Sequence, residues 1–322
     1  MAVNPTITES TAAVDNFEAV TIKQPLTPGQ LIWRRFRKHR LAMLGGIGVV
    51  LLVLFIVIGS IVVPESQANN TDLMARLSAP TSAHWFGTDS VGRDVFDRVI
   101  YGGQISLFIG LLAVILEVTF GTLIGGFAAY YGGWVDAVLM RFTEAMLAIP
   151  SLFLLIVLAK FIGRDVGQVT ILGRTFSGSI GIVILVIGIT SWMFLARIVR
   201  ANVLSLKELD YVSASKALGA NNLHIFFSHL VPNTLGPIIV AATLGLASAI
   251  LTEAYVSFLG LGVQSPTSTW GNMMQSAQSF LLQGAWWMWF FPCIFIIFTI
   301  LCINLMGDGL RDAFDPRSAK NI

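Results

Sequence analysis

The chain has 322 residues, of which 55% are hydrophobic and 12% are charged, and its formal net charge at pH 7 is +2. Its apolar residues come in long blocks rather than at the spacing of half-buried helices or strands. This composition excludes an ordinary soluble domain, and the small net charge carries little information about partners. We therefore expect an all-α integral membrane protein, because a helix satisfies its own backbone groups in lipid.

The N-terminal region combines a polar tail with a basic cluster. Residues 1–30 have the composition of a disordered tail. The cluster from Arg34 to Arg40 abuts the first apolar block, so we expect it to set topology and to contact lipid headgroups rather than nucleic acid. That block starts about forty residues into the chain and is longer than the core of a signal peptide, so we expect it to remain as an anchor.

Six apolar blocks are long enough to cross a membrane. They contain 18 to 25 residues, and at 1.5 Å per residue they cover roughly 27 to 37 Å, against a hydrocarbon core of about 30 Å. Pro150 lies inside the third block and is expected to kink or break it. An even number of crossings puts both termini on one side. The predicted spans are Leu41–Val63, Ile105–Ala129, Phe142–Ala159, Ile180–Val199, Leu235–Phe258 and Trp287–Met306.

The basic residues predict the orientation of these spans. Fourteen Lys and Arg side chains fall on the side that holds both termini and the loop of residues 206–233, whereas six fall on the opposite side. The positive-inside rule therefore predicts that both termini and this loop are cytoplasmic. The outer loop from Leu259 to Trp286 has no charged residue, and Trp286, Trp287 and Trp289 are most simply explained as an interfacial belt.

The cytoplasmic loop contains a polar stretch between two apolar spans. We expect two short helices joined at Gly219, because glycine suits the left-handed residue that closes a helix. Asn221 or Asn222 is expected to cap the second helix, and Pro232 is expected to end it. Such a loop projects from the bilayer and is able to dock on a partner.

Charged residues outside this loop define two further candidate sites. On the outer side, Asp89, Arg93 and Asp94 form either a ligand site or a self-paired cap. Within the membrane, Glu117 and Glu253 carry carboxylates, which in lipid usually face the protein interior, pair, or line water. With Ser257, they are predicted either to line the translocation path or to support a gate.

Several segments resemble a known family. The loop resembles the coupling loop of binding-protein-dependent ABC importer permeases, although Ser213, Ser215, His229 and Val231 depart from the general pattern. The stretches quoted next resemble the C-type inner-membrane subunit of dipeptide, oligopeptide and nickel importers, in which His229 is usual. They are Arg34–Leu44, Phe86–Tyr101, Ala196–Arg200, Leu251–Gln264 and Asn304–Pro316.

The resemblance implies the architecture of a type I ABC importer permease in a prokaryotic cell membrane. It divides the chain into a tail (1–30), a first helix with an outer segment (31–103), a five-helix core with the coupling loop (104–308) and a cytoplasmic tail (309–322). The implied partners are a sister permease, two ATPase subunits, an external solute-binding protein and membrane lipid. The residues implied to dock on an ATPase subunit are Tyr211, Ser213, Ala214, Ser215, Lys216, Gly219 and Pro232.

The sequence also bears on catalysis. None of the six lysines follows a glycine, so the chain lacks a GxxxxGK phosphate loop. We therefore expect no enzyme activity and no bound cofactor here, with ATP and Mg²⁺ used by the partner ATPase subunits. The alternatives are an ATP-independent secondary transporter or channel, for which we find no internal repeat, and an intramembrane hydrolase, for which no HExxH or GxSxG motif is present. The transported solute stays open among dipeptides, longer peptides and nickel chelates.

Overall fold

The computed structural model describes residues 27–162, 167–171 and 174–315. Within these residues, five single helices are long and apolar enough to cross a membrane. Five of the six predicted spans correspond to α2 (Arg40–Val62), α4 (Val95–Tyr131), α7 (Ser179–Leu206), α10 (Val231–Phe258) and α12 (Trp287–Phe314). Several helices run past the predicted limits, because the polar residues at their ends continue the same backbone ladder beyond the hydrocarbon zone. The prediction of an all-α membrane fold is confirmed.

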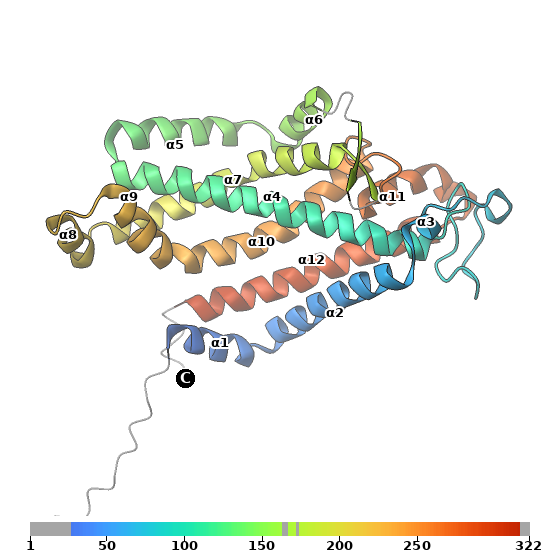
Figure 1. The fold of residues 1–322 in the computed structure, drawn as a ribbon, viewed down its shortest axis with the longest axis horizontal. Helices are drawn as coiled ribbons and strands as arrows, with labels where there is room; N and C mark the ends of the chain where they lie inside the picture. The colour runs from blue at the N-terminus through green and yellow to red at the C-terminus, as the bar shows by residue number, and fades with distance from the viewer. Residues whose placement is uncertain (1–26, 163–166, 172–173, 316–322) are drawn as a thin grey trace, which may run out of the picture.

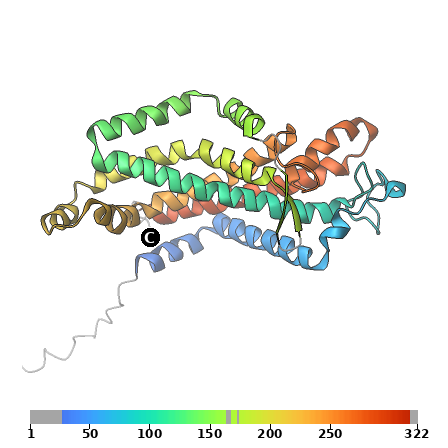
Figure 2. The same cartoon turned by 45° about the horizontal axis from the view of Figure 1, so that its top comes forward.

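The third predicted span is a bent pair of helices. Helix α5 (Gly133–Ala148) ends before Pro150, and α6 (Ser151–Ile162) leaves at 89° to it. The break follows from the proline, which has no N–H to donate to the preceding turn. The two helices run along the outside of the bundle in both views (Figures 1 and 2).

The centre of the bundle is the packing of α4 against α7 and α10. Close approach depends on glycines of α4. A side chain at Gly121 would press on Leu195 of α7, and one at Gly125 would collide with the backbone of Ala196. The missing side chains of these two glycines therefore permit the close contact of α4 with α7, as small residues do at helix contacts in membranes generally.

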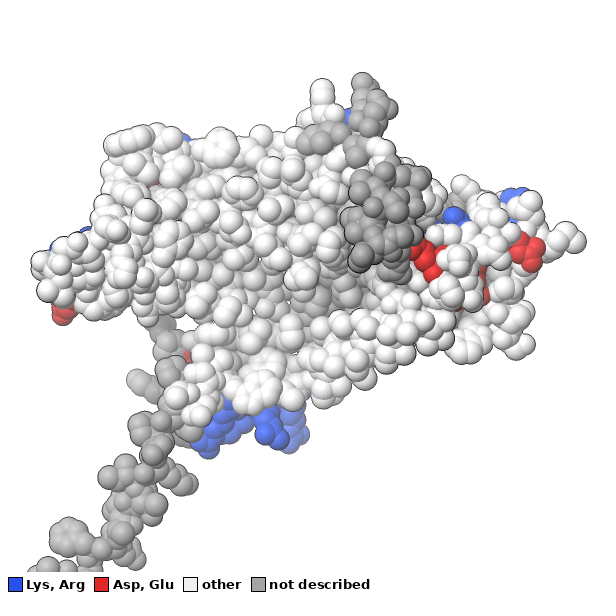
Figure 3. Space-filling model, viewed as in Figure 1, with Lys and Arg blue, Asp and Glu red and all other residues white. Residues whose placement is uncertain are grey.

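The two ends of the bundle differ. One end gathers five parts of the chain (Figure 1). They are helix α1 (Pro28–Lys38), the turn between α4 and α5, the short helices α8 (Asp210–Ala217) and α9 (Asn222–Ile225), and the end of α12. The start and the finish of the described chain therefore share a side. Charged side chains also gather towards the ends, and the middle of the visible face is almost free of them (Figure 3), as expected of a surface in contact with lipid.

The opposite end, which the sequence predicts to be the outer one and which we call the outer end, contains short elements that cover the bundle. These are α3 (Glu65–Ala68), the 3₁₀ turns η1 (Leu73–Ala75) and η3 (Gln278–Gln283), helix α11 (Trp270–Ala277), and the antiparallel hairpin of β1 (Gln168–Ile171) and β2 (Arg174–Ser177). In the hairpin, Gln168 pairs with Ser177 and Ile171 with Arg174. Helix α11 packs against α4, α10 and α12, so the uncharged outer loop folds onto the bundle.

Three sequence-based predictions need correction. Residues 1–26 lie outside the described residues, but α1 begins at Pro28, because Thr27 and Gln30 cap its N-terminus. Pro232 does not end a helix: α9 continues through the π-helical turn η2 (Phe226–Leu230) into α10. Trp287 is only 7% exposed and donates to the backbone oxygen of Thr88 at 3.0 Å, so it belongs to the core rather than to an interfacial belt.

The π turn explains why Pro232 is tolerated. The N–H of Val231 bonds to the oxygen of Phe226, five residues back, and this widened turn directly precedes the proline. Pro232 therefore lies at the first positions of α10, where a missing N–H and a fixed φ cost little.

Candidate functional site

The loop of residues 206–233, which the sequence predicts to be cytoplasmic, folds as expected up to Pro232. Helix α8 ends at Ala217, and Gly219, two residues later, has a φ of +83°. The N–H groups of Gly219 and Ala220 bond to the oxygens of Lys216 and Ser215. This pair of bonds is the Schellman arrangement that closes a helix on a left-handed residue. Asn221 then caps α9, since its side chain accepts from the N–H of His224 at 2.6 Å. The loop is therefore an ordered pair of short helices.

One face of α8 is anchored and the other is free. Val212 is fully buried and packs in a cluster with Val203, Phe226 and Leu230. The predicted docking residues Tyr211, Ser213, Ala214, Lys216, Gly219 and Pro232 are all exposed. Ser215 is half-buried, and its hydroxyl lies 3.5 Å from Nε2 of His229. The structure thus brings the predicted set together, with Pro232 at the foot of α10.

The loop is also fastened to the helices beneath it. The ammonium of Lys207 donates to the backbone oxygen of Ala129 at 3.0 Å, at the end of α4. The hydroxyl of Tyr130 donates to the side chain of Asn222 at 2.8 Å. The ammonium of Lys216 lies 5.5 Å from the ring centre of Tyr130, so this lysine contacts its own chain. These contacts make the loop and the end of α4 one unit.

Helices α5 and α7 are joined next to this unit by an ion pair. The guanidinium of Arg200 donates from Nε and Nη2 to the two carboxylate oxygens of Asp136, each at 2.6 Å. This two-point geometry is stronger than that of an ordinary surface pair. Sequence analysis missed the pair, because its members are 64 residues apart.

At the outer end, Glu253 is the centre of a buried hydrogen-bond network. Its side chain has no exposed surface. The hydroxyl of Ser257 donates to one carboxylate oxygen at 2.7 Å, and the hydroxyl of Ser106 donates to the other at 2.9 Å. Ser106 also accepts from the N–H of Trp270 at 3.3 Å. The network therefore ties α4, α10 and α11 together.

Close backbone packing surrounds this network. A side chain at Gly262 would collide with Ser257, and one at Gly271 would meet the backbone of Ala254. The indole of Trp270 is buried, and its N–H donates to the oxygen of Val99 at 3.0 Å. Ser106 and Trp270 were not predicted as site residues, because no local sequence pattern links them to Glu253.

Glu117 has a different environment. It is 8% exposed, lies near the middle of α4, and faces Gly245 of α10, where an added side chain would approach the carboxylate to 2.7 Å. Among the described residues, its carboxylate has no hydrogen-bond or ion-pair partner. The missing side chain of Gly245 leaves the space that this carboxylate occupies.

The outer charged residues form an internal cap. Asp89 accepts from Nε of Arg93 at 2.7 Å and from the N–H groups of Val91 and Arg93. Asp94 caps α4, since its side chain accepts from two N–H groups of the first turn, and it lies 2.8 Å from Nδ1 of His84. The geometry favours the self-paired cap over a ligand site.

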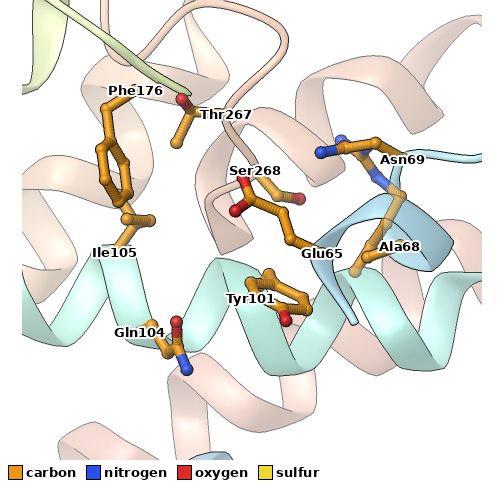
Figure 4. Close-up of a pocket in the computed structure, with 10 residues that line it drawn as sticks. Glu65, Ala68, Asn69, Tyr101, Gln104, Ile105, Phe176, Thr267 and Ser268 are labelled. Atoms are coloured by element: carbon orange, nitrogen blue, oxygen red, sulfur yellow. The ribbon is translucent and has the colours of Figure 1, made fainter. Parts of the chain in front are cut away.

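A small recess with a mostly apolar exposed lining lies between α3, α4 and the loop before α11. Its volume is about 350 Å³, including open solvent at its mouth. Figure 4 shows that Glu65 of α3, Tyr101 and Gln104 of α4, and Ser268 of the loop before α11 line it.

Within the part of the chain that the structure describes, no three His, Cys, Asp or Glu side chains come together as metal ligands.

The fold and these two ends define a class of protein: a polytopic helical membrane component with an ordered loop of short helices at one end and a covered opposite end. Comparison with protein families makes this specific. Residues 121–320 match the family described as binding-protein-dependent transport system inner membrane component, and residues 27–80 match the N-terminal TM domain of oligopeptide transport permease C. The chain belongs to the family of binding-protein-dependent transport system inner membrane components.

Curated relatives agree with this assignment. The chain is 40% identical to the dipeptide transport system permease protein DppC of Bacillus subtilis, with 94% of this chain and 90% of the relative covered. It is 40% identical to the oligopeptide transport system permease protein OppC of the same species, over 89% and 88%. It is 37% identical to the glutathione transport system permease protein GsiD of Pectobacterium atrosepticum, over 92% and 93%. The chain is therefore a transport permease subunit.

Proposed function

We propose that this chain forms half of the translocation path of an ATP-driven importer for peptides or similar small solutes. A sister permease forms the other half, an external solute-binding protein delivers the solute, and two ATPase subunits hydrolyse ATP with Mg²⁺. The family assignment supports a binding-protein-dependent system, and the names of the relatives support peptides as the solute.

The proposed orientation puts both termini and the α8–α9 loop in the cytoplasm. The distribution of Lys and Arg supports it, because fourteen of the twenty belong to the connections and tails of that side. The loop then meets the compartment in which ATP is available.

The observation that carries the proposal is the free face of α8. This helix is held by Val212 from within and by the contacts of Lys207 and Tyr130 at its sides, yet it exposes Tyr211, Ala214 and Gly219. A small, rigid, exposed helix presents little ordering cost to a partner. We assign this face to the groove of an ATPase subunit.

At the outer end, we assign Glu253 and Ser257 to the support of a gate. Both side chains are buried, and their hydrogen bonds hold α11 against α4 and α10. A carboxylate with no exposed surface does not contact a solute in this conformation. Glu117 keeps its assignment as a residue of the path or gate, since it is the described carboxylate at mid-membrane depth without a partner.

The test is Gly219→Glu in the assembled importer. No other atom lies within 4 Å of the position that a side chain would occupy at Gly219, so the change adds a charged group to the free face rather than to the core. We expect the variant to insert in the membrane but to lose the ATPase subunits on co-purification and to lose solute uptake.

Gly284→Glu is the matched control. Gly284 has the same φ of +83° and the same open surroundings, but it lies at the outer end. It carries the same backbone strain, and we expect it to keep the ATPase subunits. Normal uptake by Gly219→Glu would refute the docking assignment, and a wild-type chain that brings down no ATPase would instead support an ATP-independent transporter.

A further inference from the structure

Helix α1 was predicted only as a basic cluster, and the structure gives it a defined form. The side chain of Thr27 accepts from the N–H of Gln30 at 3.4 Å, and the N–H of Thr27 donates to the side chain of Gln30 at 3.0 Å. This reciprocal capping, with Pro28 in the first turn, begins a helix of 11 residues. Basic residues fill its last turn, where they are favoured by the helix dipole.

The orientation of α1 is fixed by its contacts with the bundle. Phe36 is buried and packs with Ala42 and Ala313. The guanidinium of Arg35 donates to the backbone oxygen of Asp315 at 3.1 Å, and His39 lies 3.5 Å from the carboxylate of Asp312. Because one side of α1 is held in this way, the opposite side has a defined direction.

The opposite side of α1 carries Arg34, Arg37 and Lys38, and together with Arg40, the first residue of α2, they form the basic patch. All four side chains are exposed, and none forms an ion pair with any described residue. Other basic side chains of the same chain are neutralised internally, as Arg93 is by Asp89 and Arg200 by Asp136. Four exposed cations within seven residues, without an ion-pair partner among the described residues, form a positive surface that is open to an anionic partner.

The position of the basic patch indicates that source. The patch lies on the flank of the bundle at α1, whereas α8 occupies the tip (Figures 1 and 3). The apolar span α2 starts at Arg40, so the patch is at the level where hydrocarbon gives way to headgroups. Leu31 and Trp33 are 40% and 59% exposed on the same helix, and tryptophan is favoured at this interface.

We propose that the basic patch binds the headgroups of anionic phospholipids and that α1 is an interfacial anchor of the permease. Charge complementarity and the flanking position carry this assignment. Each cation near an anionic surface strengthens binding by about five-fold, and salt weakens the interaction. This proposal does not depend on the docking role of α8.

The experiment measures lipid retention by native mass spectrometry on the full chain, with phosphatidylglycerol and phosphatidylcholine as probes. We expect the wild-type chain to prefer phosphatidylglycerol. The variant Arg34→Gln/Arg37→Gln/Lys38→Gln should bind phosphatidylglycerol more weakly by on the order of 100-fold at low salt, since three cations are lost. The matched control is Arg76→Gln/Arg141→Gln/Lys160→Gln, which removes three exposed cations elsewhere and should change the affinity little.

Two further variants and one co-purification separate the outcomes. Arg34→Lys and Arg37→Lys keep the charge and should retain the lipid, which distinguishes an electrostatic role from a structural one. Unchanged phosphatidylglycerol affinity in the triple variant, or equal affinity of the wild type for both lipids, would overturn the proposal. The triple variant is also co-purified with the ATPase subunits. If it loses these subunits while its affinity for phosphatidylglycerol is unchanged, the proposal is overturned and the patch is assigned to a protein partner.

Discussion

Replacing Glu253 by Ala removes the acceptor at the centre of the outer network. The side chain accepts from the hydroxyls of Ser106 and Ser257 at 2.9 and 2.7 Å and is fully buried. Each buried hydrogen bond contributes about 1 kcal/mol net, and a donor left unsatisfied raises the loss further, so the cost is about 2 to 4 kcal/mol. Because Ser106 also accepts from the N–H of Trp270, we expect this cost to appear as local opening of α11.

Hydrogen exchange of the α11 backbone measures this opening. A loss of 2 to 4 kcal/mol corresponds to exchange that is faster by roughly 30-fold to 1000-fold. Glu253→Gln keeps the volume and one acceptor oxygen, so its effect should be about half as large in free energy. Thr234→Ala is the control, because this buried hydroxyl at the other end of α10 donates only within its own helix, to Leu230. Unchanged exchange of α11 in Glu253→Ala would refute the role of the carboxylate as an anchor.

Two changes test the packing of the bundle. Gly125→Leu should prevent α4 from approaching α7 and should abolish a stable folded chain in detergent. Gly181→Leu is the control, because a Cβ at that position meets no atom within 4 Å. It should change the free energy of unfolding by less than about 1 kcal/mol. Asp136→Asn should lower the free energy of unfolding by about 1 to 2 kcal/mol, because the two-point pair with Arg200 is partly screened by solvent. Glu144→Gln breaks a far more exposed pair and should change the melting temperature little; equal shifts for both acidic variants would contradict the ranking.

Much of the membrane fold follows from the sequence alone. Long apolar blocks satisfy the one requirement that lipid imposes on a backbone, so the five single helices lie where the blocks predict them. Pro150 predicts a break, but the direction of α6 depends on what α5 and α6 pack against. Thr27 and Gln30 are a capping signal that could have located the start of α1. The prediction that Pro232 ends a helix was wrong, because the widened turn η2 directly before it removes the conflict between a proline and the preceding helical turn.

The candidate sites differ in how much of each can be predicted from the sequence. Local chemistry predicts the loop, since Gly219 and Asn221 determine its turn and its cap within three residues of each other. The network of Glu253 depends on Ser106 and Trp270, which come from other helices and are 164 residues apart. Only the three-dimensional packing of α4, α10 and α11 brings these groups together, and the periodicity of the sequence does not predict that packing.

Helix α4 connects the two candidate sites. It has 37 residues, and at 1.5 Å per residue it spans about 55 Å, more than the thickness of the bilayer. Its C-terminal end holds the loop through the oxygen of Ala129 and the hydroxyl of Tyr130. Its outer part holds Ser106 against Glu253. A displacement of the loop would therefore act on the same helix that supports the outer network, and the close, glycine-lined contact with α7 limits how far that helix can shift.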